Sequence, residues 1–187
     1  MTQPADDRAL IAGIAAQDQR ALRSLIARHQ LRVFRFAARI VRDSTTAEDV
    51  TNEVFLEVWR NAATFEGRSS PTTWLLSIAH NRAVSTLRKR REAAWDENAA
   101  QEIADTDDDP EVVAQKADKS AVMRRCLDGL SAEHRAVIDL VYYHEQSIAE
   151  VSAVLGIPEA TVKTRMFYAR KKLSELLKAA GVDRGWP

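Results

Sequence analysis

An acidic segment near the middle of the chain constrains the fold more than any other feature. Residues 92–115 carry nine acidic side chains and no basic one. Like charges in such a run repel each other, the segment lacks a sustained apolar face, and its DDDP stretch (107–110) is a turn signal. We therefore interpret 92–115 as a flexible acidic linker. It divides the 187-residue chain into an N-terminal unit, residues 5–91, and a C-terminal unit, residues 116–180.

Both units have the pattern of helical bundles. Apolar residues recur at three- and four-residue steps, most clearly over 22–40, and the chain has only six Gly and five Pro. No run of alternating apolar and polar residues bounded by hairpin turns interrupts this pattern. The sequence thus predicts an all-α fold of two small helical domains.

Local signals place several helix starts. Thr45 and Glu48 have the spacing of a capping box, and so do Ser147 and Glu150. Ser70 followed by proline is a good N-cap with proline at the first helical position. We therefore expect helices to begin near these three positions.

The C-terminal unit contains a helix-turn-helix signature. A short helix over 148–155 ends at Gly156, and Pro158 opens a longer basic helix. In this motif the first turns of the second helix meet base edges and phosphates. Short hydroxyls and long cations suit that task, although a solvated helix face would share the composition. The predicted DNA contacts are Glu159, Thr161, Lys163, Thr164, Arg165, Arg170 and Lys171.

A second basic cluster ends the N-terminal unit. Residues 67–91 carry six basic side chains and no acidic one, directly before the acidic linker. Cations attract phosphates, and the Asn81 amide can read the edge of an unstacked base. The same cluster could instead complement a helix dipole, and Trp74 is more simply a core residue than a base platform. The cations are Arg68, Arg82, Arg88, Lys89, Arg90 and Arg91.

Composition argues against several other classes. One cysteine excludes an internal disulfide framework and a multi-cysteine zinc site. His29 and Cys126 are interpreted as core residues, and no metal-ligand spacing is present, so we expect no cofactor and no enzymatic activity. No apolar run approaches the roughly 18 residues that span a bilayer, and the first residues lack a secretory pattern. A cytoplasmic protein without a membrane segment of its own is expected.

Three segments in order resemble the extracytoplasmic-function (group four) sigma factors of bacterial RNA polymerase. They are AEDVTNEVFLEVWRN (47–61), TTWLLSIAHNRAVSTLRKRR (72–91) and SIAEVSAVLGIPEATVKTRMFYARKKL (147–173). The resemblance implies an alternative sigma factor that binds core RNA polymerase, recognises and melts promoter DNA and is held by an anti-sigma factor.

The resemblance also implies residue roles. Residues 5–91 would be region two and 116–180 would be region four, which reads the −35 element. The loop 64–71 and the helix after it would capture the −10 element, through Arg68, Asn81, Arg82, Arg88, Lys89, Arg90 and Arg91. Contacts to core polymerase would come from Asp49, Asn52, Glu53 and Phe55.

Two other functions fit parts of the sequence. An autonomous helix-turn-helix regulator would need only 147–173 and would select DNA sites without polymerase. A sigma-like decoy would bind an anti-sigma factor and touch no DNA, but it would not need the basic residues 88–91 that this chain has.

Overall fold

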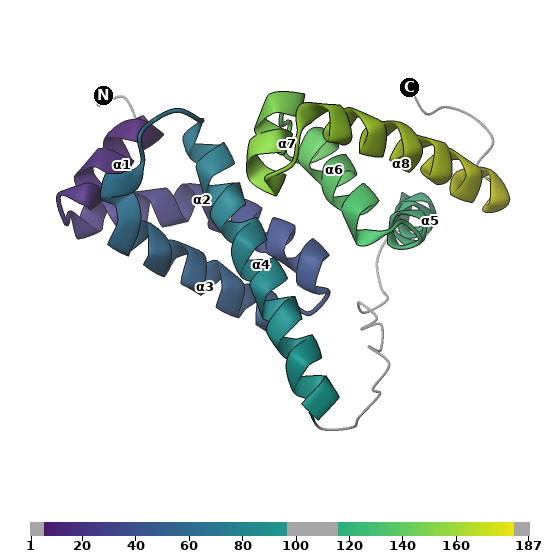
Figure 1. Cartoon of the computed structure of the whole chain (residues 1–187), viewed down its shortest axis with the longest axis horizontal. Coiled ribbons are helices and arrows are strands. Elements are labelled where there is room, and N and C mark those ends of the chain that lie inside the picture. The colour runs from purple at the N-terminus through teal and green to yellow at the C-terminus, as the bar shows by residue number, and fades with distance from the viewer. Residues whose placement is uncertain (1–5, 97–115, 182–187) are drawn as a thin grey trace. The chain divides into compact units, whose positions relative to one another are not determined.

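The chain forms two compact units. The computed structural model describes residues 6–96 and 116–181, and all regular structure within these ranges is helical (Figure 1). Helices α1 to α4 build the first unit, and α5, α6 and α8 pack together in the second. Residues 97–115, which hold most of the predicted acidic linker, lie outside the described residues. The prediction of an all-α fold is confirmed for the described part of the chain.

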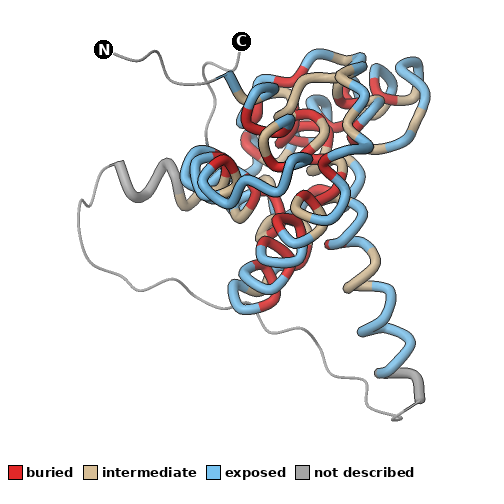
Figure 2. The backbone as a smooth tube through the Cα atoms, turned by 90° about the vertical axis from the view of Figure 1, so that its left-hand side faces the viewer, coloured by how far each residue is buried: buried red, intermediate tan, exposed pale blue. Residues whose placement is uncertain are grey.

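The first unit is a bundle in which three long helices pack against one another. Helix α2 (Gln19–Val41) packs on α3 (Ser44–Asn61) and on α4 (Pro71–Asp96). The side chains that α2 buries recur at three- and four-residue steps, so one apolar stripe faces the other helices. The buried residues of α2 include Leu25, His29, Val33, Phe36 and Ala37. Figure 2 colours the buried residues of the described chain red.

Helix α1 (Asp7–Ala15) is an element that the sequence analysis did not predict. It buries Leu10, Ile11 and Ile14 and packs on α2, α3 and the short 3-10 helix η1 (Ala62–Thr64). The spacing of these three residues, at i, i+1 and i+4, is that of a short amphipathic helix.

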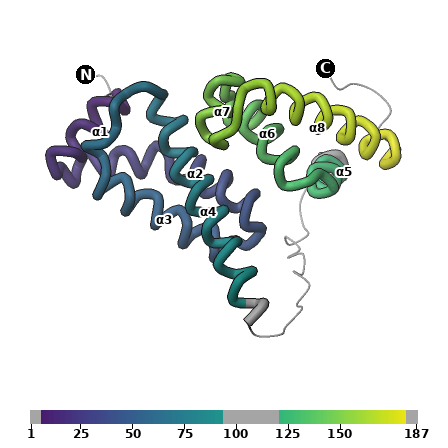
Figure 3. Tube along the Cα trace, viewed as in Figure 1, coloured from purple at the N-terminus to yellow at the C-terminus, as the bar shows by residue number. Residues whose placement is uncertain are grey.

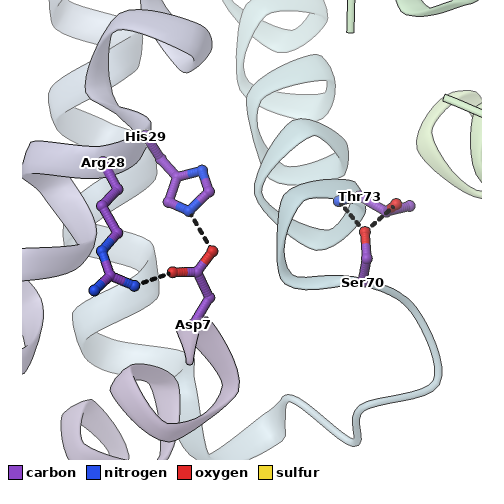
Figure 4. Close-up of polar contacts among 5 residues, drawn as sticks. All are labelled: Asp7, Arg28, His29, Ser70 and Thr73. Atoms are coloured by element: carbon purple, nitrogen blue, oxygen red, sulfur yellow. Dashed lines mark hydrogen bonds and ion pairs between the residues drawn. The ribbon is translucent and has the colours of Figure 1, made fainter. Parts of the chain in front are cut away.

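One carboxylate fastens the start of α1 to α2. Asp7 Oδ1 lies 2.8 Å from Arg28 Nη1, and Asp7 Oδ2 lies 2.7 Å from His29 Nε2 (Figure 4). Burial opposes the charged form, but hydrogen bonds from Arg28 and His29 hold the pKa of Asp7 below its ordinary value of 3.8. His29 is therefore a buried residue with a partner, as expected.

Replacing Asp7 with asparagine should destabilise the protein by about 1 kcal/mol at neutral pH, because a charged acceptor of two hydrogen bonds is lost. Because the pKa of Asp7 is lower in the folded state than in the unfolded state, the ionised carboxylate stabilises the fold at pH values above its ordinary pKa. This stabilisation is lost as the pH falls through the pKa of the folded state. The gap in free energy of unfolding between wild type and Asp7→Asn should close below that pH. Urea unfolding at several pH values measures it, and exposed Asp6→Asn is the matched control. A gap that does not change with pH would contradict this prediction.

Helix α3 starts at a different cap from the one predicted. Asp43 is its N-cap, accepting from the Thr46 amide at 2.7 Å and from the Thr46 hydroxyl, and these bonds lower the pKa of Asp43. The prediction of a Thr45–Glu48 box is wrong. Asp is at least as good an N-cap as Thr, so the earlier residue starts the helix.

The other two predicted helix starts are confirmed. The Ser70 hydroxyl accepts from the Thr73 amide at 3.1 Å, and α4 begins at Pro71. Ser147 and Glu150 bond reciprocally, with Ser147 N to Glu150 Oε2 at 2.9 Å and Glu150 N to Ser147 Oγ at 3.3 Å. Helix α4 runs on to Asp96, five residues beyond the point where the sequence placed the linker.

The second unit is organised around its last helix. Helices α5 (Lys116–Asp128) and α6 (Ala132–Tyr142) both pack on α8 (Glu159–Ala179). Helix α7 (Ile148–Leu155) precedes α8 in the chain, as the trace in Figure 3 shows. Gly156 has a φ of +65°, and the Ser152 hydroxyl donates to the Ile157 carbonyl at 2.6 Å, which fixes the turn between α7 and α8. Cys126 is a buried free thiol, as expected of a small core residue.

Candidate protein and nucleic-acid interfaces

The outer face of α3 presents a polar surface. Asp49, Asn52 and Glu53 are all exposed, because they lie opposite the buried stripe of Val50, Val54 and Val58. Their spacing of three and four residues keeps them on one side of the helix. The structure therefore brings together three of the four residues predicted to contact polymerase.

Phe55 is a correction to that set. Its side chain is only 6% exposed and belongs to the core, whereas the next residue, Leu56, is 52% exposed. One helical residue turns through about 100°, so neighbours in sequence differ in face. Leu56 stands seven residues after Asp49, on the same side of α3, and it is the apolar residue that the sequence analysis missed.

A groove of about 460 Å³ lies between α2 and α3 beside this surface. Leu31, which is 57% exposed, and Asn52 both line it. Exposed apolar side chains next to carboxylates and an amide make a surface suited to a partner helix with apolar and basic residues. The remaining lining residues are Ala27, Gln30, Phe34, Glu48 and Thr51.

The loop before α4 is held at both ends. Phe65 and Trp74 pack with their ring centroids 5.0 Å apart, and Trp74 is partly buried rather than fully enclosed. At the other end Ser70 bonds Thr73 (Figure 4). Arg68 is exposed and forms an ion pair with Glu66. Trp74 is thus a partly buried residue that contacts the start of the loop through Phe65.

The predicted DNA-contact residues on α4 differ in their surroundings. Asn81 is exposed, and so are Lys89 and Arg91. Arg88 lies 3.9 Å from Glu92, and Arg90 lies 3.9 Å from Asp43, but both arginines remain more than half exposed. These are weak surface pairs that leave the cations available to another anion.

Arg82 is exposed, but it forms ion pairs with two carboxylates of α3. Its Nε donates to Glu57 Oε2 at 2.6 Å, and its Nη1 lies 3.8 Å from Glu53 Oε2. Arg82 therefore ties α4 to α3 and lies beside the acidic surface of α3. Next to Asn81, burial lowers the pKa of His80, with a hydrogen bond to Asn81 opposing the shift. The positive charge of this face therefore comes from arginine and lysine.

Helix α8 presents a mixed polar face to solvent. The residues that α8 buries against its neighbours are Val162, Met166, Ala169, Leu173 and Leu177. Among the predicted contacts, Thr161 and Arg165 are half-buried, and Arg165 lies 3.1 Å from Glu133. The other five are exposed: Glu159, Lys163, Thr164, Arg170 and Lys171.

Two aromatic residues on α8 were missed by the sequence analysis. Phe167 is 59% exposed and Tyr168 is 53% exposed, and their rings meet edge to face with centroids 5.4 Å apart. Neither position belongs to the apolar stripe that α8 buries, so the same helical spacing that predicts an exposed Lys163 also predicts that these two rings are exposed. Large aromatic rings between cations are a surface suited to bases and thymine methyl groups.

The described residues contain neither a cluster of metal-binding side chains nor a helix suited to a membrane. Within 6–96 and 116–181 no three His, Cys, Asp or Glu side chains form a group that could hold a metal ion. Among the same residues no helix is both long enough and apolar enough to cross a membrane.

Comparison with known proteins agrees with this geometry. The family model for sigma-70 region 2 matches residues 25–93, and that for sigma-70 region 4 matches residues 126–175. The ECF RNA polymerase sigma factor SigK of Mycobacterium ulcerans is 36% identical over 179 residues, which cover 94% of this chain and 95% of SigK. SigL of Mycobacterium tuberculosis, also an ECF sigma factor, is 33% identical over 177 residues, covering 94% of this chain and 99% of SigL.

Two solved structures are also similar. CnrH, in complex with the cytosolic domain of CnrY, has a TM-score of 0.68 at 29% identity, covering 92% of this chain and 97% of that chain. The sigma factor RpoE of Bartonella quintana, in complex with the anti-sigma factor NepR, has a TM-score of 0.69 at 27% identity, covering 85% and 96%.

The two matched regions and the named relatives identify the chain as a transcription initiation factor. The chain belongs to the sigma-70 family, with both region 2 and region 4.

Proposed function

We propose that this chain is an alternative sigma factor of the extracytoplasmic-function group, group four. It joins core RNA polymerase, directs it to a set of promoters and helps to open the DNA there. The observation that carries the proposal is the order of the two family regions, one on each compact unit. An isolated helix-turn-helix regulator would need only the second. The proposal includes residues 5–91 and 116–180 as the functional domains, joined by the acidic segment 92–115.

Core polymerase would bind the α3 surface. Asp49, Asn52 and Glu53 supply polar contacts, and exposed Leu56 takes the place first assigned to Phe55. Carboxylates at the rim of an interface attract a basic partner and speed its association. An apolar residue beside the groove adds surface that is removed from water on binding.

The −10 element would meet the loop before α4 and the exposed face of α4. Arg68, Arg88, Lys89, Arg90 and Arg91 hold phosphates, and Asn81 contacts an unpaired base. Arg82 acts through its bonds to Glu57 and Glu53, by keeping α4 in register with α3. A captured base stabilises the open state by about 1–3 kcal/mol, whereas unstacking costs a few kcal/mol per step. A few captured bases therefore offset the opening of a short bubble, with polymerase supplying the remainder.

The −35 element would lie against α8. Lys163, Thr164, Arg170 and Lys171 are exposed there, with Glu159, Thr161 and Arg165 at the edges of the same face. No catalytic group and no cofactor is assigned. We expect an anti-sigma factor as a third partner, by analogy with the RpoE–NepR complex, and a cytoplasmic location.

Transcription from a genomic DNA pool tests the proposal. Core RNA polymerase with this protein should start at discrete sites that are absent without it. An autonomous regulator would instead select duplex sites alone and fail to associate with core polymerase. A decoy would bind an anti-sigma factor and yield no transcripts.

Replacing Lys163 with alanine should weaken −35 binding and reduce the slope of log affinity against log salt concentration by about one, since one phosphate contact is lost. Binding of the reconstituted holoenzyme to −35 DNA, titrated at several salt concentrations, measures the slope. Lys178→Ala is the matched control, because Lys178 is an exposed lysine 15 residues further along α8, roughly 22 Å from Lys163 along the helix axis at about 1.5 Å per residue. Equal slopes for wild type and Lys163→Ala would refute the contact.

A further inference from the structure

The loop over residues 65–70 has a third attachment besides its two ends. Gly67 has a φ of +70°, in the left-handed region that favours glycine, and its carbonyl faces the first turn of α1. The Arg8 guanidinium donates to that carbonyl at 3.4 Å. A Cβ added at Gly67 would lie 3.6 Å from Arg8 Nη1, so the two residues are in direct proximity.

Helix α1 also packs directly against the segment that leads into the loop. The short helix η1 ends at Thr64, one residue before Phe65, and α1 lies against it. The first turn of α1 therefore contacts the loop at Gly67, and the body of the helix supports its start. Phe65 in turn rests on Trp74 at the other side.

The position of α1 is itself fixed by the neighbouring residue. Asp7 bonds Arg28 and His29 of α2 at 2.8 and 2.7 Å, and its side chain is only 24% exposed. Leu10, Ile11 and Ile14 bury the inner face of the helix. Arg8 thus lies in a helical turn that Asp7 fastens to α2. Because this turn is fixed, the hydrogen bond from Arg8 to Gly67 can restrain the loop.

We propose that α1 is a positioning element for the promoter-melting loop, with Arg8 as the positioning residue and Asp7 as its anchor on α2. The inference rests on the proposed function, because it assigns α1 a role in capturing the −10 element. A loop that is ordered before it meets DNA loses less conformational entropy on binding, and this favours the open complex. Arg8 contacts the loop backbone and needs no contact with DNA.

Arg8→Ala is the test, with Arg23→Ala as the matched control. Arg23 also donates to a backbone carbonyl at 3.4 Å, but that carbonyl, Gln19, belongs to its own helix α2. Two readouts are needed. Hydrogen exchange of the amides over 65–70 in the free protein reports loop order, and permanganate reactivity of −10 thymines in the holoenzyme complex reports opening.

For Arg8→Ala we expect faster exchange over 65–70, unchanged affinity for core polymerase and a loss of open complex of about two- to tenfold, the range for one net hydrogen bond. Arg23→Ala should leave all three unchanged. Asp7→Asn is the second variant and should change loop exchange in the same direction.

The outcomes separate this inference from the proposed function. If wild type forms open complexes while Arg8→Ala matches it in exchange and in opening, the inference is overturned and the sigma function stands. Faster exchange with unchanged opening also overturns the promoter role. If the wild-type protein itself fails to join core polymerase, the proposed function fails, and the exchange result still decides whether α1 orders the loop.

Discussion

Phe55→Ala should lower the free energy of unfolding of the first unit by about 3–5 kcal/mol. The ring is 6% exposed and lies in the stripe of α3 that also buries Val54 and Val58 at 0%. Its removal leaves a cavity between close-packed helices, and the lost contacts add to the lost transfer free energy. Urea unfolding followed by circular dichroism measures the change.

Leu56→Ala is the matched substitution, because it removes an apolar side chain one residue away on the exposed side. It should change stability by less than about 0.5 kcal/mol while weakening the binding of core polymerase. Titration of labelled protein with core polymerase provides the second measurement. If Phe55→Ala proved as stable as wild type and lost only polymerase binding, the side chain would be on the surface and the assignment of α3 faces would be reversed.

Phe55 and Leu56 mark the limit of what the sequence alone predicts about the fold. Helix starts at Ser70 and Ser147 depend on side chains within three residues of the helix, so their chemistry can be read locally. The faces of α2 also follow from spacing, because one stripe is uniformly apolar. In α3 the apolar residues Phe55 and Leu56 are adjacent, and spacing alone does not say which one the neighbouring helices cover.

The contacts that sequence reasoning could not supply are those between distant segments. Arg82 bonds Glu57 from 25 residues away, and Arg8 reaches Gly67 from 59 residues away. Which cation is already paired depends on how α4 and α1 cross their neighbours, which the sequence leaves open. A basic run therefore predicts the sign of a surface but not which of its residues are available to DNA.

Asn81→Ala should reduce open-complex formation by roughly tenfold while leaving the closed complex nearly unchanged, since one base contact contributes about 1–3 kcal/mol. Asn81 is exposed on α4, one residue before Arg82. An amide offers both a donor and an acceptor to a base edge, and that edge is accessible only after the strands separate. Permanganate footprinting measures the open complex, and a gel shift on ice measures the closed one.

Two further substitutions make the Asn81 result specific. Asn61→Ala removes the same amide from an exposed position at the end of α3 and should change neither complex. Arg88→Ala removes a cation that is 71% exposed and should weaken both complexes and flatten the salt slope, because phosphates are present before and after melting. Loss of a residue that reads an unpaired base therefore lowers the open complex alone, whereas loss of a phosphate contact lowers both complexes. If Asn81→Ala reduced the open and the closed complex equally, Asn81 would be a contact to the DNA backbone. Another residue of the loop or of α4 would then capture the unpaired base.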